Sequence, residues 1–405
     1  MLIDDLGYRA PAPVELSRVL AWKAEQKSDP TSIEDQDFVI PLAIIHDDPL
    51  ISYSGIVPQA PLGAASLLKN NRCLGPSWFL ISPTWSIEDR EVLEEIRLNA
   101  ILHRQRNPLH RLIFLCNSRE EVALVHGIGE AAIFHNKTTN VTENLFTPLA
   151  HVEREFDAIY NAHLGPWKRH ELTLDIDHCG FMFYRAGSST TESEAALIAR
   201  HAKLAPGHVF INEIGEDGRP VRLPPEQVNY HLNQAAIGLC LSELEGAMFA
   251  CAEYLLAGLP VITTPNQGGR DFYLHDEFCI TVPADRRAIA ESVAALKARK
   301  IPRDYVREQT LKRIQPHRRR FVELIDSILA ETNAPKRSIG IWPSSPPPVI
   351  MRWFRSPQAY NQIRNPAPDA FGQALMGSGD NGKSSAFAAA GKFVKRRIPA
   401  FGKRS

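Results

Sequence analysis

The sequence predicts an α/β protein made of two consecutive Rossmann-like sandwiches, each with a mostly parallel sheet covered on both faces by helices. Two observations support this fold class. Between residues 38 and 330, short apolar runs alternate with amphipathic segments, which is the pattern of strands that alternate with helices. In addition, 405 residues are too many for one typical hydrophobic core. We therefore predict one domain over residues 1–150, a second over 151–330, and a separate tail over 331–405.

In the first predicted domain, continuous apolar runs indicate buried strands, and a helical apolar period indicates the segments between them. Strands are expected at 38–45, 78–82, 112–116 and 131–135. Helices are expected at 14–27, 87–104 and 118–126. The last of these begins with a capping-type serine, Ser118, which is followed three residues later by Glu121.

The second predicted domain repeats the alternation. Strands are expected at 158–160, 180–184, 209–214, 236–241, 260–264 and 279–282. Helices are expected at 168–177, 193–203, 225–234, 250–257, 286–297 and 303–330. We expect the last helix to break near Pro316, because proline lacks the backbone donor that a helix interior needs.

The tail, residues 331–405, has a different composition from the rest of the chain. It contains the turn-rich stretches 343–348 and 377–382, so we expect it to be largely disordered. Residues 336–405 hold twelve lysines and arginines against two aspartates. The cluster Lys392–Arg397 could therefore form a basic patch that contacts an anionic membrane surface.

The overall composition excludes several classes of protein. Lysine plus arginine and aspartate plus glutamate both number 46, so no net field favours nucleic acid as a partner. Neither a signal peptide nor a membrane-spanning run is recognised, and a cytoplasmic location is expected, with peripheral contact at the inner membrane face as an option. The six cysteines lack metal-site spacing, so buried free thiols are expected and neither a disulfide framework nor a zinc site.

The segment that carries chemistry is 236–274. It predicts a strand ending at Ser242, a short loop, a helix starting near Gly246, and a strand over 260–264. The first amides of such a helix attract an anion such as a diphosphate. Glu245 and Glu253 are separated by seven residues and should face the same site, where carboxylates accept hydrogen bonds from sugar and ribose hydroxyls. Two glutamates at this spacing usually face solvent, so the pair alone does not indicate a site. The functional interpretation depends on the whole pattern of strand, glycine-led loop, helix and second strand.

This pattern, with Gly-Leu-Pro-Val-Ile at 258–262 and two glycines at 268–269, resembles the EX7E donor-site signature of retaining GT-B glycosyltransferases, family 4 in particular. The resemblance implies the GT-B fold, in which the two sandwiches face each other across a cleft. It also implies that Glu245 contacts the transferred sugar and that Glu253 contacts the ribose of the donor. The amides of the intervening segment would contact the sugar and phosphates, and its residues are Gly246, Ala247, Met248 and Phe249.

The family also places basic residues after the first strand of its C-terminal domain, where they neutralise the donor diphosphate. Lys168 lies in the corresponding segment, 160–170, and matches the family's lysine. The usual glycine-arginine pair is replaced here by Asn161 and Ala162. Arg169 or Arg270 is expected to supply the missing positive charge, and we favour Arg169.

Four other patterns are interpreted as incidental. The run 377–384 has P-loop spacing but lacks the strand and helix that a P-loop requires. Asp175 and Asp177 imitate a metal-binding DxD pair but are expected on the surface, so no metal or other cofactor is predicted. The arginines at 318–320 are expected on a solvated helix face. His126 and His135 are expected to be structural, with contact to a substrate as the alternative.

The sequence thus predicts a metal-independent, hexosyltransferase-like enzyme that transfers a sugar from a nucleotide-sugar to a glycan or lipid-linked acceptor, as in polysaccharide or glycoconjugate synthesis. By the resemblance, the donor lies mainly on the second sandwich and the transfer retains the anomeric configuration. The main alternative is a catalytically silent GT-B module that binds a glycan or a partner. A sugar-nucleotide epimerase of similar fold is a further alternative.

Overall fold

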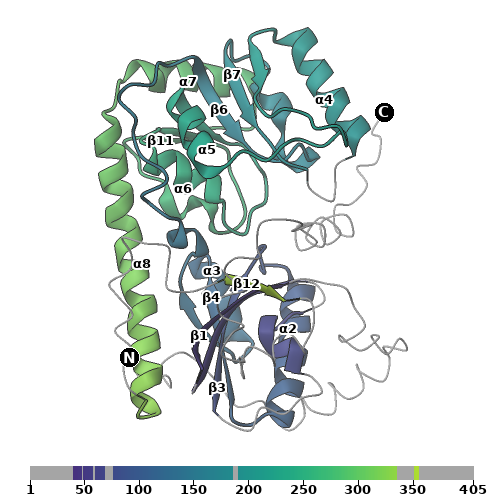
Figure 1. Ribbon diagram of the computed structural model, residues 1–405, viewed down its shortest axis with the longest axis vertical. Helices are drawn as coiled ribbons and strands as arrows, with labels where there is room; N and C mark the ends of the chain where they lie inside the picture. The colour runs from purple at the N-terminus through teal and green to yellow at the C-terminus, as the bar shows by residue number, and fades with distance from the viewer. Residues whose placement is uncertain are drawn as a thin grey trace. The chain divides into compact units, whose positions relative to one another are not determined.

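The computed structural model describes residues 40–47, 49–57, 60–68, 76–185, 190–334 and 351–354 (Figure 1). These residues divide into two compact units, and each is described by itself. Unit 1 comprises the described residues up to Phe134 together with those from Glu323 onward, and unit 2 comprises the described residues of His135–Val322. The first segment of unit 1 therefore ends at Phe134, and the unit takes up the chain again from Glu323.

Unit 1 contains a six-stranded sheet with the order β12-β1-β2-β3-β4-β5. Its strands are β1 (Ile40–Asp47), β2 (Leu50–Ile56), β3 (Ser77–Pro83), β4 (His110–Cys116), β5 (Ala131–Phe134) and β12 (Met351–Phe354). Strands β2 to β5 are parallel to one another, whereas β1 pairs antiparallel with both β2 and β12. The sheet is thus mainly parallel, with an antiparallel edge.

Two helices cover the sheet of unit 1. Helix α2 (Arg90–Arg106) begins at Asp89, whose carboxylate accepts from the amides of the first turn, and α3 (Arg119–Gly127) begins at Ser118, whose hydroxyl accepts from the amide of Glu121 at 3.0 Å. A short 3₁₀ helix, η3 (Gly63–Leu68), follows β2. Apolar side chains of α2 join the core with Phe79 and Ile81 of β3, as their helical spacing predicts.

Unit 2 contains a six-stranded sheet with the order β11-β10-β9-β6-β7-β8, and all neighbouring pairs are parallel. Its strands are β6 (Phe156–Asn161), β7 (Cys179–Met182), β8 (His208–Phe210), β9 (Ala235–Cys240), β10 (Val261–Thr263) and β11 (Cys279–Thr281). From β6 the chain builds the sheet outward through β7 and β8. It then returns to the other side of β6 and continues from β9 to β11, so the strand order reverses between β6 and β9.

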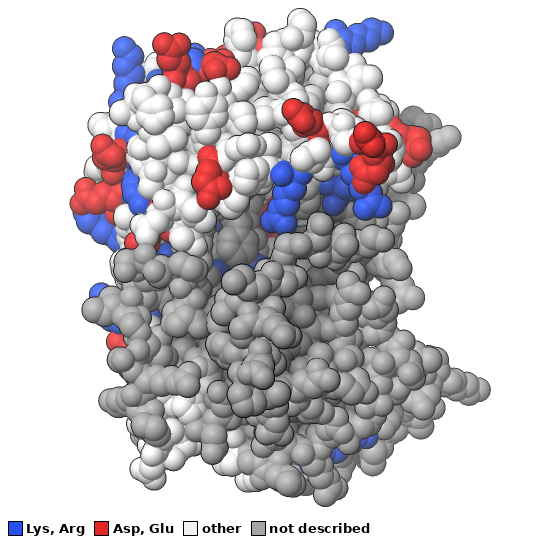
Figure 2. All heavy atoms as spheres, viewed as in Figure 1, with Lys and Arg blue, Asp and Glu red and all other residues white. Residues whose placement is uncertain are grey.

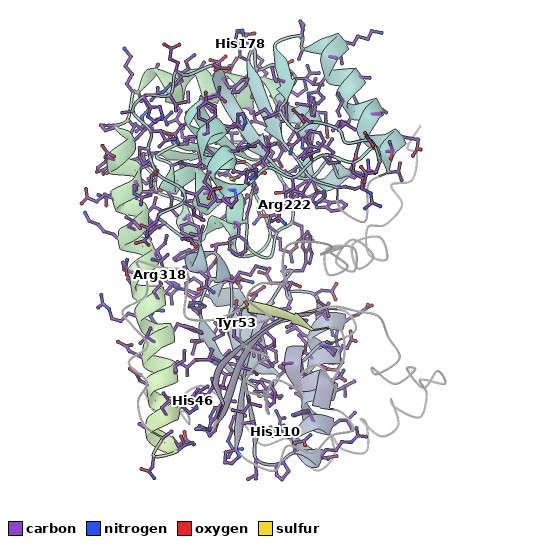
Figure 3. The ribbon with its side chains drawn as sticks, in the orientation of Figure 1. His46, Tyr53, His110, His178, Arg222 and Arg318 are labelled. Carbon is purple, nitrogen blue, oxygen red and sulfur yellow. The ribbon has the colours of Figure 1, made fainter. Side chains whose placement is uncertain are left out.

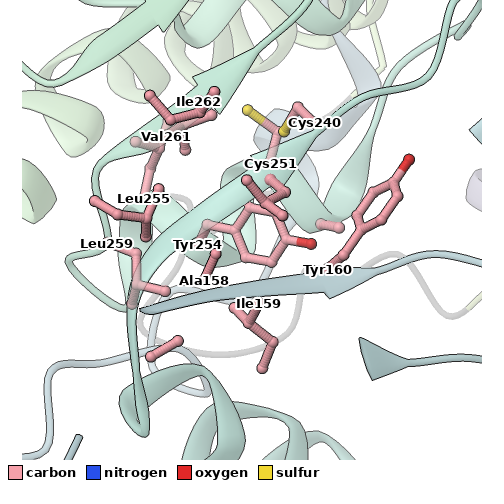
Figure 4. Close-up of a cluster of buried hydrophobic side chains, with 14 of the residues drawn as sticks. Ala158, Ile159, Tyr160, Cys240, Cys251, Tyr254, Leu255, Leu259, Val261 and Ile262 are labelled. Atoms are coloured by element: carbon pink, nitrogen blue, oxygen red, sulfur yellow. The ribbon is translucent and has the colours of Figure 1, made fainter. Parts of the chain in front are cut away.

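The helices of unit 2 are α4 (Thr191–Leu204), α5 (Pro225–Asn233), α6 (Phe249–Leu256), α7 (Arg286–Ala298) and α8 (Arg303–Glu331), of which the last continues into unit 1. Helices α5, α6 and α7 pack against the central strands. Figure 4 shows the core that they cover, in which Tyr254 and Leu255 of α6 lie among side chains of β6, β9 and β10. A side chain at Gly238 of β9 would meet Tyr254 at 2.5 Å, so glycine permits this close packing.

The predicted fold class, α/β with two mainly parallel sheets, is confirmed. The five described cysteines are free and buried, which agrees with the prediction of buried thiols, and Cys73 lies outside the described residues. Two strands were not predicted. Strand β2 carries serines at 52 and 54 that interrupt its apolar run, and β12 takes four residues from the predicted tail.

Two predictions for helices are wrong. Residues 168–177 do not form one helix but two short 3₁₀ helices, η5 (Pro166–Lys168) and η6 (His170–Thr173). They are separated by Arg169, whose left-handed backbone with φ of 53° cannot continue a helix. Helix α8 is continuous through Pro316 instead of breaking there.

Arg318 of α8 is also not on a solvated face. It is 1% exposed, and its guanidinium donates to the carbonyls of Thr139 and Val141, at 2.8 Å each, and pairs with Glu143 (Figure 3). Arg318 is buried because its guanidinium binds carbonyl groups at the end of η4 (Lys137–Asn140), a 3₁₀ helix. Without it these buried carbonyls would lack a hydrogen-bond donor.

Other predictions fall outside the described residues. They are the helix at 14–27, the P-loop-like run at 377–384 and the basic cluster at 392–397. Within the residues that the structure describes, no helix is long and apolar enough to cross a membrane. On the face of unit 2 that Figure 2 shows, acidic and basic side chains are interspersed, as the balanced composition predicts.

In each unit, two histidines meet at the same kind of junction; His103, His110 and His201 are buried and His208 is half-buried. His103 in the last turn of α2 meets His110, the first residue of β4, with Nε2 and Nδ1 2.9 Å apart. His201 in the last turn of α4 meets His208, the first residue of β8, with their Nδ1 atoms 2.9 Å apart. Burial, followed by the neighbouring histidine, lowers the pKa of His103 to about 3 and that of His201 to about 4. Both rings are therefore neutral at pH 7.

These lowered pKa values predict acid sensitivity. An unfolded histidine binds a proton below about pH 6.5, whereas folded His103 does so only near pH 3, so stability is complete above pH 6.5 and is lost as the pH falls. Between pH 7 and pH 5, the wild type should therefore lose about 2 kcal/mol of its free energy of unfolding through His103. His103→Asn should lack this loss. Denaturant titrations at both pH values measure this. His151→Asn, which changes an exposed histidine, is the control and should keep the loss.

Candidate functional site

The candidate site lies where the strand order of unit 2 reverses. In open parallel sheets, loops after the strands on either side of this point run in opposite directions and leave room for a ligand at the carboxyl ends. Strand β6 ends at Asn161 and is followed by the segment with Lys168, while β9 ends at Cys240 and is followed by Ser242 and Glu245. The two segments singled out from the sequence thus leave the sheet at one place.

The structure brings Lys168 and Glu245 into direct contact. The Lys168 ammonium pairs with Oε1 of Glu245, although the two residues are 77 positions apart, and both side chains are buried. The same oxygen accepts from the Ser242 hydroxyl at 2.5 Å. The other carboxylate oxygen, Oε2, forms no hydrogen bond with the described residues, so it is open to a hydroxyl group of a ligand.

Glu253 is held against the end of β6. The side-chain amide of Asn161 donates to its Oε2 at 3.2 Å, and the backbone amide of Asn161 donates to the hydroxyl of Tyr254 at 2.6 Å. Burial raises the pKa of Glu253 to about 7, an effect that the Asn161 hydrogen bond partly offsets. Asn161 therefore orients Glu253, the second of the two glutamates singled out from the sequence. Sequence reasoning noted the substitution but not this role.

Between the two glutamates, the backbone forms an open loop before the helix. The helix was predicted to start near Gly246, but α6 begins at Phe249, and Met248 at its N-cap has extended backbone angles. The reason is that the loop is tied to residues further along the chain, since the amide of Gly269 donates to the carbonyl of Gly246 at 2.8 Å. Among the described residues, the amides of Gly246, Ala247, Met248 and Phe249 have no acceptor, so they can still bind an anion.

Both arginines proposed to replace the family's arginine are bound to the protein itself. Arg169 donates through Nε to the carbonyl of Leu241 at 2.7 Å and through Nη2 to Thr264 at 2.8 Å. Arg270 is 1% exposed and donates to the carbonyls of Cys240, Ser242 and Thr264. Their charges contribute to the site. Arg270 uses most of its N–H groups on the ends of β9 and β10, whereas Arg169 uses two of its five.

Aromatic side chains line the site next to Lys168, and sequence reasoning missed them. His163 contacts Trp167 and Tyr184 edge to face, with ring centroids 4.8 and 5.8 Å apart. Burial, and then the charge of Lys168, lowers the pKa of His163 to about 2, so the imidazole is neutral. Tyr184 follows β7 and is 37% exposed, and both Glu245 and Glu253 act on its hydroxyl electrostatically. No spacing in the sequence indicates that these three rings meet.

The remaining candidates have other partners or are exposed. Asp175 and Asp177 are exposed, as expected, and Asp175 pairs with Arg286. His135 is buried, bonds to Asn140 at 3.2 Å and stacks on a phenylalanine ring. His126 bonds to a backbone carbonyl at 3.2 Å. The two histidines therefore have structural contacts of their own.

Comparisons with known proteins find similarity of fold only. No protein-family model matches the chain, and no curated protein matches its sequence. Among solved structures, Anabaena HepE in complex with UDP is 12% identical in sequence, with a TM-score of 0.49. The match covers 66% of this chain and 76% of the HepE chain.

Two further solved structures give similar values. Sucrose-phosphate synthase from Thermosynechococcus elongatus is 13% identical, with a TM-score of 0.47, and the match covers 62% of this chain and 68% of the synthase chain. A glycosyltransferase from Rickettsia africae is 15% identical over 62% and 70%, with a TM-score of 0.45.

The buried ion pair predicts strong coupling between its partners. Lys168→Met leaves the Glu245 carboxylate buried without its cation, which should cost about 3–5 kcal/mol in free energy of unfolding. Adding Glu245→Gln removes that charge, so the double variant should be more stable than Lys168→Met alone. Chemical unfolding of the wild type, the two single variants and the double variant measures the coupling. Additive effects of the two substitutions would contradict the buried contact.

Proposed function

We propose that this protein is a GT-B glycosyltransferase, similar to family 4, that transfers a sugar from a nucleotide-sugar donor to an acceptor. The contact between Lys168 and Glu245 carries this proposal. The two residues were selected separately, as matches to two different segments of the family's donor site. Their direct contact at the strand-order reversal is what a shared donor site requires.

The proposed roles follow from the polar groups that remain open. Glu245 accepts hydrogen bonds from hydroxyls of the transferred sugar through Oε2. Glu253 accepts from the ribose, and the amides of 246–249 donate to the sugar and the phosphates. Lys168 and Arg169 supply positive charge for the diphosphate. When the donor binds, the ammonium of Lys168 lies within reach of both Glu245 and the leaving phosphate.

The chemistry proposed is electrostatic. As the bond between the anomeric carbon and the phosphate oxygen breaks, negative charge grows on the diphosphate, and the fixed cation and amides stabilise it. Glu245 then positions the sugar and does not act as a general base. Transfer with retention of configuration and without a metal ion forms part of the proposal. A chelator should leave activity unchanged, and the anomeric configuration of the product is read by NMR.

The acceptor is proposed to be a glycan or a lipid-linked glycan bound mainly by unit 1. The protein is proposed to be cytoplasmic. Its basic cluster at 392–397 would bind it peripherally to the inner face of the membrane. This cluster lies outside the described residues, so the proposal rests on its sequence alone.

A panel of nucleotide-sugars and free nucleotides tests the function. A ligand at a hundred times its dissociation constant stabilises the folded state by about 2.7 kcal/mol, which raises the melting temperature by several degrees. We expect at least one nucleoside diphosphate and its sugar to do so, with slow nucleotide release when an acceptor is present. If no member of the panel raises the melting temperature, the donor site does not exist. If donors bind but no transfer occurs with any acceptor, the chain is the catalytically silent subunit.

The two glutamates should differ in their effects. Glu253→Ala should weaken nucleoside diphosphate binding about tenfold or more, because it removes hydrogen bonds to a charged group. Glu245→Gln keeps the side-chain volume and should instead lower the transfer rate about a hundredfold, because the sugar loses its fixed position. Calorimetric binding and nucleotide-release assays measure these effects.

Glu226→Ala is the control, since Glu226 is an exposed glutamate of the same unit at the start of α5. It should leave both binding and transfer unchanged. Equal losses of binding and rate in the Glu245 and Glu253 variants would contradict the assigned roles.

A further inference from the structure

The cations identified so far in the candidate donor site all bind groups of the protein itself. Lys168 is already paired with Glu245, and Arg169 and Arg270 are bound to the ends of β9 and β10. A nucleotide-sugar diphosphate carries two negative charges, and Glu253 adds partial negative charge near pH 7. A further guanidinium with open donors would therefore balance this negative charge.

Arg222 is such a group. It is exposed, and it forms neither a hydrogen bond nor an ion pair with another described residue. It acts electrostatically on Glu253 and on Tyr184, where its positive charge favours the ionised forms. Figure 3 shows Arg222 at the opposite end of unit 2 from His178, which precedes β7. Arg222 therefore lies on the same side as the carboxyl ends of the strands.

Backbone hydrogen bonds fix the position of residue 222. Residues 213–221 form a small hairpin, in which the amide of Val221 donates to the carbonyl of Glu213 at 2.8 Å. The buried side chain of Asn212 links this hairpin to the sheet. It accepts from the amide of Phe183 at 2.7 Å and donates to the carbonyl of Val221 at 2.8 Å. Arg222 is thus held beside Tyr184, at the end of β7.

We propose that Arg222 binds the diphosphate of the donor and supplies the cation that the motif segment lacks at Asn161 and Ala162. The inference rests on the proposed function and adds a binding residue to it. A guanidinium suits this task because its planar donors match two phosphate oxygens at once. Its place on a hairpin outside the EX7E and lysine segments explains why no motif in the sequence indicates it.

The test compares three variants by calorimetric titration with several nucleoside diphosphates that differ in base. Arg222→Ala should weaken binding of all of them by the same factor, about tenfold or more, and leave the order of base preference unchanged. Arg222→Lys keeps the charge but not the planar donors, so its loss should be smaller. The control is Arg219→Ala, which changes an exposed arginine of the same hairpin and should have no effect.

The outcomes separate this inference from the proposed function. If the wild type binds no nucleoside diphosphate, both fail. If the wild type binds and Arg222→Ala binds equally well, only the role of Arg222 fails. A loss confined to one base would assign Arg222 to base recognition and overturn phosphate binding. An equal loss in Arg219→Ala would reduce the effect to general surface charge. Unchanged melting temperatures of the unliganded variants confirm that they fold.

Discussion

The candidate site of unit 2 depends on the reversal of strand order between β6 and β9. Because all six strands are parallel, every loop that follows a strand leaves at the same edge of the sheet, and only at the reversal do two neighbouring loops turn away from each other. One of these loops carries Lys168 and the other Glu245. The topology of the sheet therefore brings these two distant segments together, and the ion pair between Lys168 and Glu245 joins them.

Arginines hold unit 2 together by binding backbone carbonyls. Arg303 donates to the carbonyls of Asn233 and Ala235, and Arg307 donates to those of Leu256 and Glu143. Arg270 does the same at the ends of β9 and β10. Each guanidinium adds hydrogen bonds to carbonyl groups inside the unit, and a buried carbonyl left without any donor would cost about 1–3 kcal/mol. This use explains why Arg270, which follows the motif closely in sequence, has few donors left for a ligand.

The sequence predicted what depends on local pattern. Continuous apolar runs located most strands, and Ser118 marked the start of α3 correctly. The segment 168–177 was assigned to a helix because its pattern is helical, whereas the tertiary bonds of Arg169 hold its backbone in a left-handed turn. The role of Asn161 and the meeting of His163, Trp167 and Tyr184 could not be predicted either, because they depend on which loops the sheet brings together. Strand β12 has a short, polar-interrupted sequence that local pattern does not distinguish from a linker.

The buried thiols give this protein an internal reporter of local opening. Cys116 lies in the sheet of unit 1, whereas Cys179, Cys240, Cys251 and Cys279 lie in unit 2. Burial raises the pKa of Cys116, Cys179 and Cys279, so little thiolate forms while these residues stay enclosed. Alkylation must then wait for a fluctuation that exposes the sulfur. Labelling rates, resolved by cysteine, would therefore distinguish the opening of one sheet from that of the other in the intact protein.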